Sequence, residues 1–193
     1  MRPWGLPALL LVSGLLAGCT STTTGPAPAA LVTCAGGTVI QPAGAPYCYL
    51  LPAGFTDYTG KVTVQVQSDV PTSYASVVGI AVYDSIQVSV VRLRADSDSI
   101  SMAALTDGLS SSMSNMTAHG LIVGQSTSAA PVDNDRTVQV TLTKGNLYTS
   151  TIYAVFRGYT EIAINCQSSE REPDVDRACA SIRQTIRIVD LPR

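Results

Sequence analysis

Histidine is nearly absent from this chain. His119 is the only histidine among 193 residues, and a Ser-His-Asp triad would have to include it. No serine lies in a Gly-x-Ser-x-Gly motif, which holds the nucleophile of many hydrolases. His119 follows a predicted helix and precedes Gly120, and a charge-tolerant residue near a helix C-terminus needs no catalytic role. We therefore expect no catalytic residue and no enzymatic activity.

Charged residues are also few, at 13% of the chain, and the net charge is −2. Two lysines stand against ten arginines, and no run of like charge occurs. Without a basic surface to neutralise phosphates, nucleic acid is excluded as a partner. No Cys-x-x-Cys motif is present and one histidine does not complete a zinc site, so we expect no metal and no cofactor.

The chain has no apolar run long enough to span a membrane as a helix. The apolar run at 6–16 is shorter than the roughly 20 residues that a spanning helix needs, and it follows Arg2, as in a signal peptide. The run ends in Leu16-Ala17-Gly18-Cys19, which matches the lipobox of bacterial lipoproteins. We expect residues 1–18 to be a cleaved lipoprotein signal peptide and the Cys19 thiol to carry the lipid.

A segment rich in Ser, Thr, Gly, Pro and Ala follows Cys19. Its composition predicts a flexible tether over residues 19–33 that leads to one folded domain over 34–193. Acyl chains such as palmitate contribute about 0.8 kcal/mol per buried methylene, so two or three chains would anchor the protein stably. We expect an extracytoplasmic domain held at the cell membrane by its N-terminal lipid; whether the tether threonines carry sugars stays open.

Four further cysteines lie in the predicted domain: Cys34, Cys48, Cys166 and Cys179. An even number in an exported chain implies disulfides, and three pairings are open. We favour Cys34–Cys48 and Cys166–Cys179 because each pair is close in sequence. Each bond would close a loop of about 15 residues, which the chain-entropy model values at about 3 kcal/mol.

Alternating apolar and polar residues predict several strands. These are residues 61–67, 77–83, 86–94, 137–143, 148–156 and 159–166, with 121–126 as a further candidate. The alternation at Ile86, Val88 and Val90 changes phase at Val91 and Leu93, which predicts a bulge. Turns are expected at 144–146 and 157–158.

Two amphipathic helices interrupt the strands. The first carries an apolar stripe of Met102, Leu105, Leu109, Met113 and Met116, with Asp98 or Ser99 as its cap and Gly120 at its end. The second begins at Pro173, with an apolar face of Val175, Ala178, Cys179, Ile182 and Ile186. Strands joined by short turns, with two one-sided helices to pack on them, predict an α+β domain: an antiparallel sheet of about six strands flanked by two main helices.

A family resemblance lies in the order of these elements. The segment Pro52-Ala53-Gly54-Phe55 opens the domain, a central helix lies between strands, Cys166 ends a strand, and Cys179 sits on a final helix that runs into Arg187-Ile188. Over about residues 45–190 the chain resembles the PsbP-like α/β/α sandwich in its LpqN-type actinobacterial lipoprotein version. The resemblance implies a non-enzymatic envelope protein and supplies no catalytic residues.

Three polar or aromatic groups deserve a functional and a structural interpretation. Asp133-Asn134-Asp135 is similar to the start of a calcium loop but lacks its glycine and distal glutamate, so a turn is favoured. An acidic cluster with interleaved Arg171 and Arg177 could bind calcium or form a solvated helix start, which we favour; it comprises Glu170, Glu172, Asp174 and Asp176. Asp96 and Asp98 are interpreted as capping residues. A set of aromatic residues in the first third of the domain could be exposed binding anchors or ordinary half-buried strand residues. The set is Tyr47, Tyr49, Phe55, Tyr58, Tyr74 and Tyr83.

Three functions remain open from the sequence. The favoured one is a binding or adaptor domain in the cell envelope that holds a protein partner or an apolar ligand. The second is a hydrolase of envelope polymers, which would need two carboxylates about 5–9 Å apart in a cleft. The third is a purely structural lipoprotein.

Overall fold

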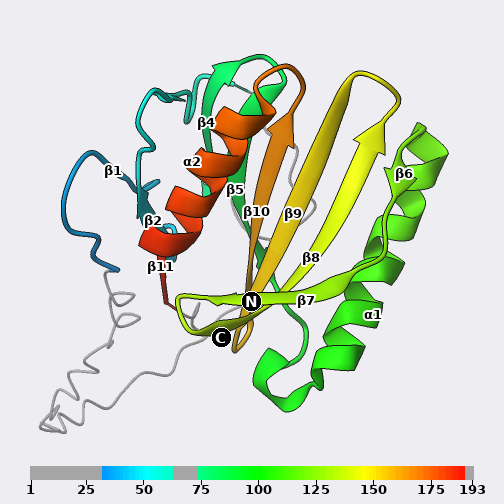
Figure 1. The fold of residues 1–193 in the computed structure, drawn as a ribbon. Coiled ribbons are helices and arrows are strands. Elements are labelled where there is room, and N and C mark those ends of the chain that lie inside the picture. Colours follow the sequence, from blue (N-terminus) through cyan, green and yellow to red (C-terminus); the bar gives the residue numbers. More distant parts are fainter. Residues whose placement is uncertain (1–31, 63–73, 190–193) are drawn as a thin grey trace, which may run out of the picture.

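The computed structural model describes residues 32–62 and 74–189 (Figure 1). Its helices are α1 (Met102–Met113) and α2 (Glu172–Thr185), with short 3₁₀ helices η2 (Ser97–Ser99) and η3 (Ser114–His119). Its strands are β1 (Val39–Ile40), β2 (Tyr47–Leu50), β3 (Thr56–Asp57), β4 (Ser76–Ala81), β5 (Asp84–Arg92), β6 (Ile122–Val123), β7 (Thr127–Val132), β8 (Asp135–Lys144), β9 (Tyr148–Arg157), β10 (Thr160–Ser168) and β11 (Arg187–Ile188). None of the helices within these ranges is long and apolar enough to cross a membrane.

Two antiparallel sheets form the framework. The main sheet has eight strands in the order β3-β4-β5-β10-β9-β8-β6, with β7 paired to β8 as well, and a small sheet has the order β1-β2-β11. The predicted antiparallel α+β class with two main helices is confirmed, but the prediction of about six strands was too low. The strands that were not predicted are β1, β3 and β11, which have two residues each and are too short to carry a period, β2, which has four, and β7, which does not alternate. β6 lies within the candidate strand 121–126. The predicted strand 61–67 lies largely outside the described residues.

α2 covers one face of the main sheet, over β5 and β10 (Figure 1). Its buried residues Val175, Ala178, Cys179 and Ile182 pack against Ile86, Val88, Val90, Ile162 and Ile164 of the two strands. Burial of each large aliphatic side chain contributes roughly 1.5–3 kcal/mol, so this layer is the main core. A disulfide joins Cys166 of β10 to Cys179 of α2, which is the pairing that the sequence favoured.

The small sheet lies beside α2 on the same face and is fastened by tyrosines. Tyr47 and Tyr49 of β2 are fully buried, and their rings stack with centroids 6.2 Å apart. Both hydroxyls lie 2.9 Å from the Ser76 hydroxyl on β4, and burial raises the pKa of both far above its ordinary value. These two tyrosines are therefore core residues, and a role as exposed binding anchors is wrong for them. The Cys34–Cys48 disulfide, also as favoured, ties β2 to the segment before β1.

α1 packs on the opposite face, over β8 and β9. Leu105 and Leu109 contact a row formed by Val138, Val140, Leu142, Ala154 and Phe156. The Ser101 hydroxyl caps the helix by accepting from Ala104 N at 3.2 Å, so the predicted cap at Asp98 or Ser99 was wrong. Those two residues belong to η2, which Asp96 caps. Gly120, at φ 75°, ends the helical segment as predicted.

The phase change in β5 has a different cause from the predicted bulge. β5 pairs with β10 without interruption from Ser85 to Arg92, and the nearby register shift lies between Gly79 and Ala81 of β4. Val91 pairs with Glu161 on the α1 side of the sheet, and Leu93 packs into the α1 core. Both faces of the sheet bury apolar residues at this end of β5, so the alternation is lost although the strand is regular.

A buried carboxylate holds the loop that starts α2. Asp84, only 2% exposed, accepts hydrogen bonds from Ser169 N (2.8 Å), the Ser169 hydroxyl (3.0 Å) and Arg171 N (3.0 Å). Burial would raise the pKa of this carboxyl, but these bonds and one from the Glu170 N–H outweigh it and hold the pKa below the ordinary 3.8. The start of β5 thereby fixes the approach of α2 to the sheet.

Replacing Asp84 by Asn removes the charge but keeps the shape. We expect the free energy of unfolding at pH 7 to fall by about 1.5–3 kcal/mol, because hydrogen bonds to a charged acceptor are lost. A carboxyl whose pKa is lower in the folded state than in the unfolded state stabilises the fold at pH values above its unfolded pKa. This stabilisation is lost as the pH falls through the folded-state pKa. Denaturant unfolding should therefore show a difference from wild type that shrinks below about pH 3.8. Asp107→Asn, at an exposed site on α1, is the control, and a pH-independent deficit in Asp84→Asn would contradict the account.

Candidate ligand-binding site

A groove runs along α1 on the face of the sheet opposite α2. It has a volume of about 350 Å³ and lies over β5 and β10, next to the strip that α1 covers. We call it the sheet groove; it is lined by Gln87, Ser89, Val91, Ser112, Met113, Met116, Ile152, Glu161, Ala163 and Asn165. The volume falls in the range of small-molecule sites, which is about 300–1,000 Å³.

Strand register places the floor of the sheet groove. Glu161, Ala163 and Asn165 alternate along β10 and pair with Val91, Ser89 and Gln87 of β5. Because side chains on every second residue share a face, all six lie on the α1 side. Met113 and Met116 border the groove at the end of α1 and the start of η3. The groove thus combines a floor with polar groups and a wall of flexible thioethers, which adapt to irregular apolar ligands.

Glu161 is the only charged residue of the sheet groove. Its neighbours across the strands are Val91 and Phe156, and within the described chain its carboxylate forms no hydrogen bond or ion pair. Burial raises the pKa of its carboxyl from 4.5 to about 7. The side chain is half-buried where the polar and the apolar residues of the groove meet, and there it can accept a hydrogen bond or pair with a cation.

A second hollow, which we call the edge hollow, continues from Gln87 toward the β3–β4 edge of the sheet. It measures about 470 Å³ and is lined mainly by small and apolar residues, namely Tyr58, Val62, Val77, Gly79, Ala81, Val82, Ser85 and Gln87. Val82 is 85% exposed at its rim. Because Gln87 lines both, the edge hollow can receive the far end of a ligand that starts in the sheet groove.

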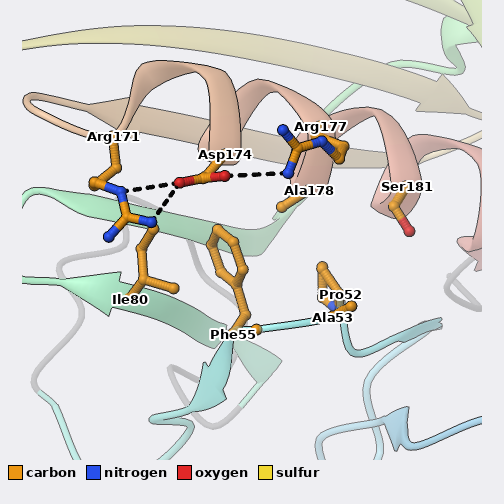
Figure 2. A pocket seen from close by; sticks show the side chains of 10 residues that line it. Pro52, Ala53, Phe55, Ile80, Arg171, Asp174, Arg177, Ala178 and Ser181 are labelled. Atoms are coloured by element: carbon orange, nitrogen blue, oxygen red, sulfur yellow. Dashed lines mark hydrogen bonds and ion pairs between the residues drawn. The ribbon is translucent and has the colours of Figure 1, made fainter.

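Asp174 of the acidic cluster lines a third hollow, of about 280 Å³, between α2 and the Phe55 loop (Figure 2). Asp174 stands between two arginines and bonds to Arg171 Nη2 at 2.5 Å and to Arg177 Nη1 at 3.1 Å. Those hydrogen bonds hold the pKa of Asp174 below its ordinary value. Within 32–62 and 74–189, no three His, Cys, Asp or Glu side chains are grouped to hold a metal ion. The cluster is therefore best described as a charged helix start.

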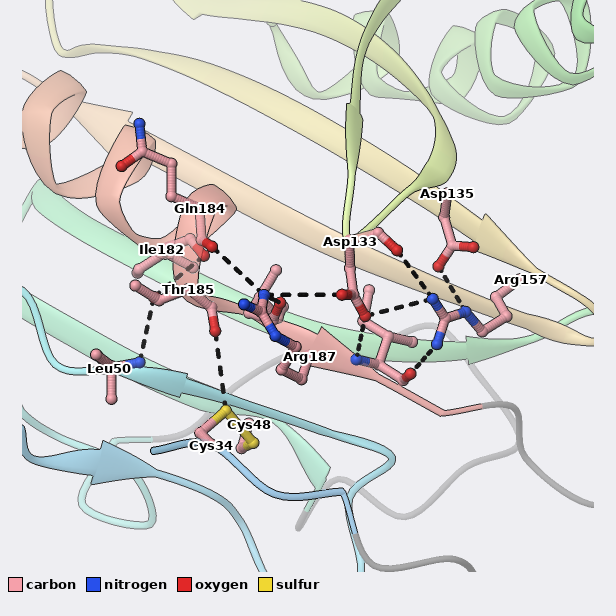
Figure 3. Close-up of polar contacts among 12 residues, drawn as sticks. Cys34, Cys48, Leu50, Asp133, Asp135, Arg157, Ile182, Gln184, Thr185 and Arg187 are labelled. Atoms are coloured by element: carbon pink, nitrogen blue, oxygen red, sulfur yellow. Dashed lines mark hydrogen bonds and ion pairs between the residues drawn. A yellow bond between two sulfur atoms is a disulfide. The ribbon is translucent and has the colours of Figure 1, made fainter. Parts of the chain in front are cut away.

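The segment Asp133-Asn134-Asp135 forms the β7–β8 turn, with positive φ at Asp133 (51°) and Asn134 (67°). The favoured turn is confirmed. Figure 3 shows Arg157, at the end of β9, between the two aspartates: Nη2 lies 3.3 Å from Asp133 Oδ2, and Nε lies 2.6 Å from Asp135 Oδ2. Arg157 also donates to the Ile188 carbonyl, and Ile188 N donates to Asp133 at 2.8 Å. This network links the main sheet to β11, so these carboxylates have a structural role.

The remaining predicted residues have separate positions. His119 is exposed at the end of η3 and is not among the residues that line the sheet groove. The four domain cysteines form the two disulfides, and Cys19 lies outside the described residues together with the signal peptide and most of the tether. Val32, assigned to the tether, is 7% exposed, and its carbonyl accepts from Gln41 Nε2 at 3.1 Å. Tyr58 borders the edge hollow, and Tyr83 stacks on Tyr148.

This arrangement of a sheet with helices on both faces has solved counterparts. The chain is similar to cyanobacterial PsbP (CyanoP) from Synechocystis sp. PCC 6803, with a TM-score of 0.52 and 14% identity over 82% of this chain and 99% of that one. The fold is PsbP-like. A crystal structure from Bacteroides thetaiotaomicron VPI-5482 has a TM-score of 0.50 and 9% identity; the match covers 80% of this chain and 49% of the longer one. Neither protein-family models nor curated proteins give a match. At these identities the likeness establishes the fold alone.

The sequence interpretation missed the sheet groove of this PsbP-like domain. Glu161, Ala163 and Asn165 are the polar or small half of the alternation in β10, which is typical of a solvent-facing side. A helix predicted on each face would have placed them on the same face as α1, beside it. The one available signal was an acidic residue next to the apolar run of Ile162 and Ile164.

Replacing Glu161 by Gln tests the environment of the groove. A carboxyl whose pKa is higher in the folded state than in the unfolded state contributes its full stabilisation of the fold below the unfolded pKa, near 4.5. This stabilisation is lost as the pH rises through the folded-state pKa of about 7. We expect wild type to lose roughly 1–3 kcal/mol of stability between these values, and Glu161→Gln to lose less. Thermal unfolding at pH 4.5 and pH 8 measures this, with Glu172→Gln on the opposite face as the control. If the stability of Glu161→Gln and of wild type depended on pH in the same way, the burial of the Glu161 carboxyl would be refuted.

Proposed function

We propose that this protein is a non-enzymatic binding module of the bacterial cell envelope and that the sheet groove holds an apolar ligand. The observation that carries the proposal is the groove itself, a concave surface on which five apolar and five polar side chains converge. That combination is typical of small-molecule sites. The edge hollow beyond Gln87 extends it toward the length of an elongated ligand.

We also propose where the protein is located and to which kind of lipoprotein it belongs. The lipobox at Cys19 supports a lipid-anchored, extracytoplasmic domain, and the order of elements supports an LpqN-type actinobacterial lipoprotein. The PsbP-like fold is compatible with both, since folds of one type carry many functions. A protein that binds an apolar molecule at the membrane surface would receive or deliver it there.

Hydrolysis by paired carboxylates has less support. Asp133 and Asp135 share Arg157, and Asp174 is held by two arginines, so each of these carboxylates has cationic partners. Glu161 has no second carboxylate among the residues of the sheet groove. No observation favours a purely structural role over binding.

Native mass spectrometry of protein from the original host tests the proposal. Residues 1–18 are replaced by an ordinary secretory signal and Cys19 by Ser, so that the chain is recovered without detergent. We expect extra mass that disappears on denaturation. Ser112→Trp, at an exposed position on the groove wall, should reduce the occupied fraction at least about fivefold, because the indole fills the groove.

The matched control is Ser111→Trp, the neighbouring exposed residue of α1 that does not line the groove. It should keep the extra mass. Bare polypeptide mass in the unsubstituted chain would overturn the proposal and direct attention to protein partners. Equal loss in both variants would place the ligand elsewhere.

A further inference from the structure

The charge in the sheet groove has no countercharge. Every element around the groove contributes uncharged side chains: Gln87, Ser89 and Val91 from β5, Ser112, Met113 and Met116 from α1 and η3, Ile152 from β9, and Ala163 and Asn165 from β10. The acidic and basic groups of α2 and of the Arg157 network lie on or beside other surfaces. Glu161 is thus a single acid in an otherwise neutral groove.

An uncompensated carboxylate selects among apolar ligands by their head groups. A carboxylate or phosphate head would place like charges together, and an uncharged head would leave a buried charge without a partner. An ammonium group gains the most, because it pairs with the charge and supplies N–H donors in a site of low dielectric constant. Charge complementarity therefore favours a cationic head.

We propose that the sheet groove recognises an amphiphile with an ammonium head group, which pairs with Glu161 while the apolar chain lies against Met113, Met116 and Ile152. The inference rests on the proposed function and names its ligand class. Asn165 lies four residues further along β10 on the same face, about 13 Å from Glu161, and its carboxamide oxygen accepts from the Ser150 hydroxyl, so it lines the path of the ligand chain and not the head group. The apolar chain of the ligand can continue past Gln87 into the edge hollow.

The pairing makes recognition dependent on pH. Above about 7 the free carboxyl is ionised and discriminates in favour of the cation. As the pH falls below that value the carboxyl takes up a proton, and an ammonium must displace it before pairing. The preference for a cationic head should therefore weaken on acidification, whereas binding of an uncharged amphiphile should not.

Three probes with the same chain test this: dodecylamine and dodecanoate, each below its micelle concentration, and dodecanol, below its solubility limit. The protein is the mature chain with Cys19→Ser, and affinity is measured by titration calorimetry at pH 8 and pH 5.5. We expect dodecylamine to bind at least about tenfold more tightly than dodecanol at pH 8, with dodecanoate weakest. Glu161→Gln should reduce the tenfold ratio to less than about threefold, and Glu172→Gln should leave it unchanged.

The outcomes separate this inference from the proposed function. Equal affinity for the three probes, or a preference for dodecanoate, overturns the ammonium inference and leaves an apolar groove. A preference for dodecylamine that persists in Glu161→Gln also overturns it, because another group would then supply the recognition. Failure of every probe to bind, together with bare polypeptide mass from the host, overturns both.

Discussion

Packing of α2 on one face of the main sheet is the interaction on which the rest of the structure depends. The helix, the small sheet and the Cys166–Cys179 disulfide all occupy the face formed by Ile86, Val88, Ile162 and Ile164. The opposite face is served by α1, which packs over β8 and β9. An eight-stranded sheet is wider than one helix, whose diameter with side chains is about 10–12 Å. The sheet groove follows from this unequal cover.

Polar contacts fix how the layers meet, because apolar packing alone has little direction. The tyrosine pair on β2 reaches Ser76 of β4, and Arg157 at the end of β9 reaches β11 and the β7–β8 turn. Asp84 holds the loop before α2 from the start of β5. Each contact joins segments far apart in sequence and leaves few polar groups unpaired. Glu161 differs from all of them, since its polar atoms have no such partner among the described residues.

Much of this fold could be predicted from the sequence where one periodic signal dominates. The longer strands β8 and β10 and the helix α2 have one apolar face each, and their positions were predicted within a few residues, as was that of β9, which carries apolar residues on both faces. The two-residue strands β1, β3 and β11 could not be predicted, because pairing with distant partners defines them, whereas β6 lies within the candidate strand 121–126. Val91 was misinterpreted as part of a bulge because both faces of the sheet are buried near it. The sheet groove needs the register of β5 against β10, which no local pattern contains.

The proposed ligand site lies beside the C-terminal end of α1, where methionine side chains allow a direct measurement of binding. Besides Met1 the chain has three methionines: Met113 and Met116 border the sheet groove, and Met102 lies at the other end of α1. At 1.5 Å per residue, Met102 is about 16 Å from Met113 along the helix. We would label the methionine methyl groups with carbon-13 and record their NMR shifts during titration with dodecylamine. The account predicts saturable shifts at Met113 and Met116, with Met102 unchanged; binding that leaves both groove methionines unshifted would contradict it.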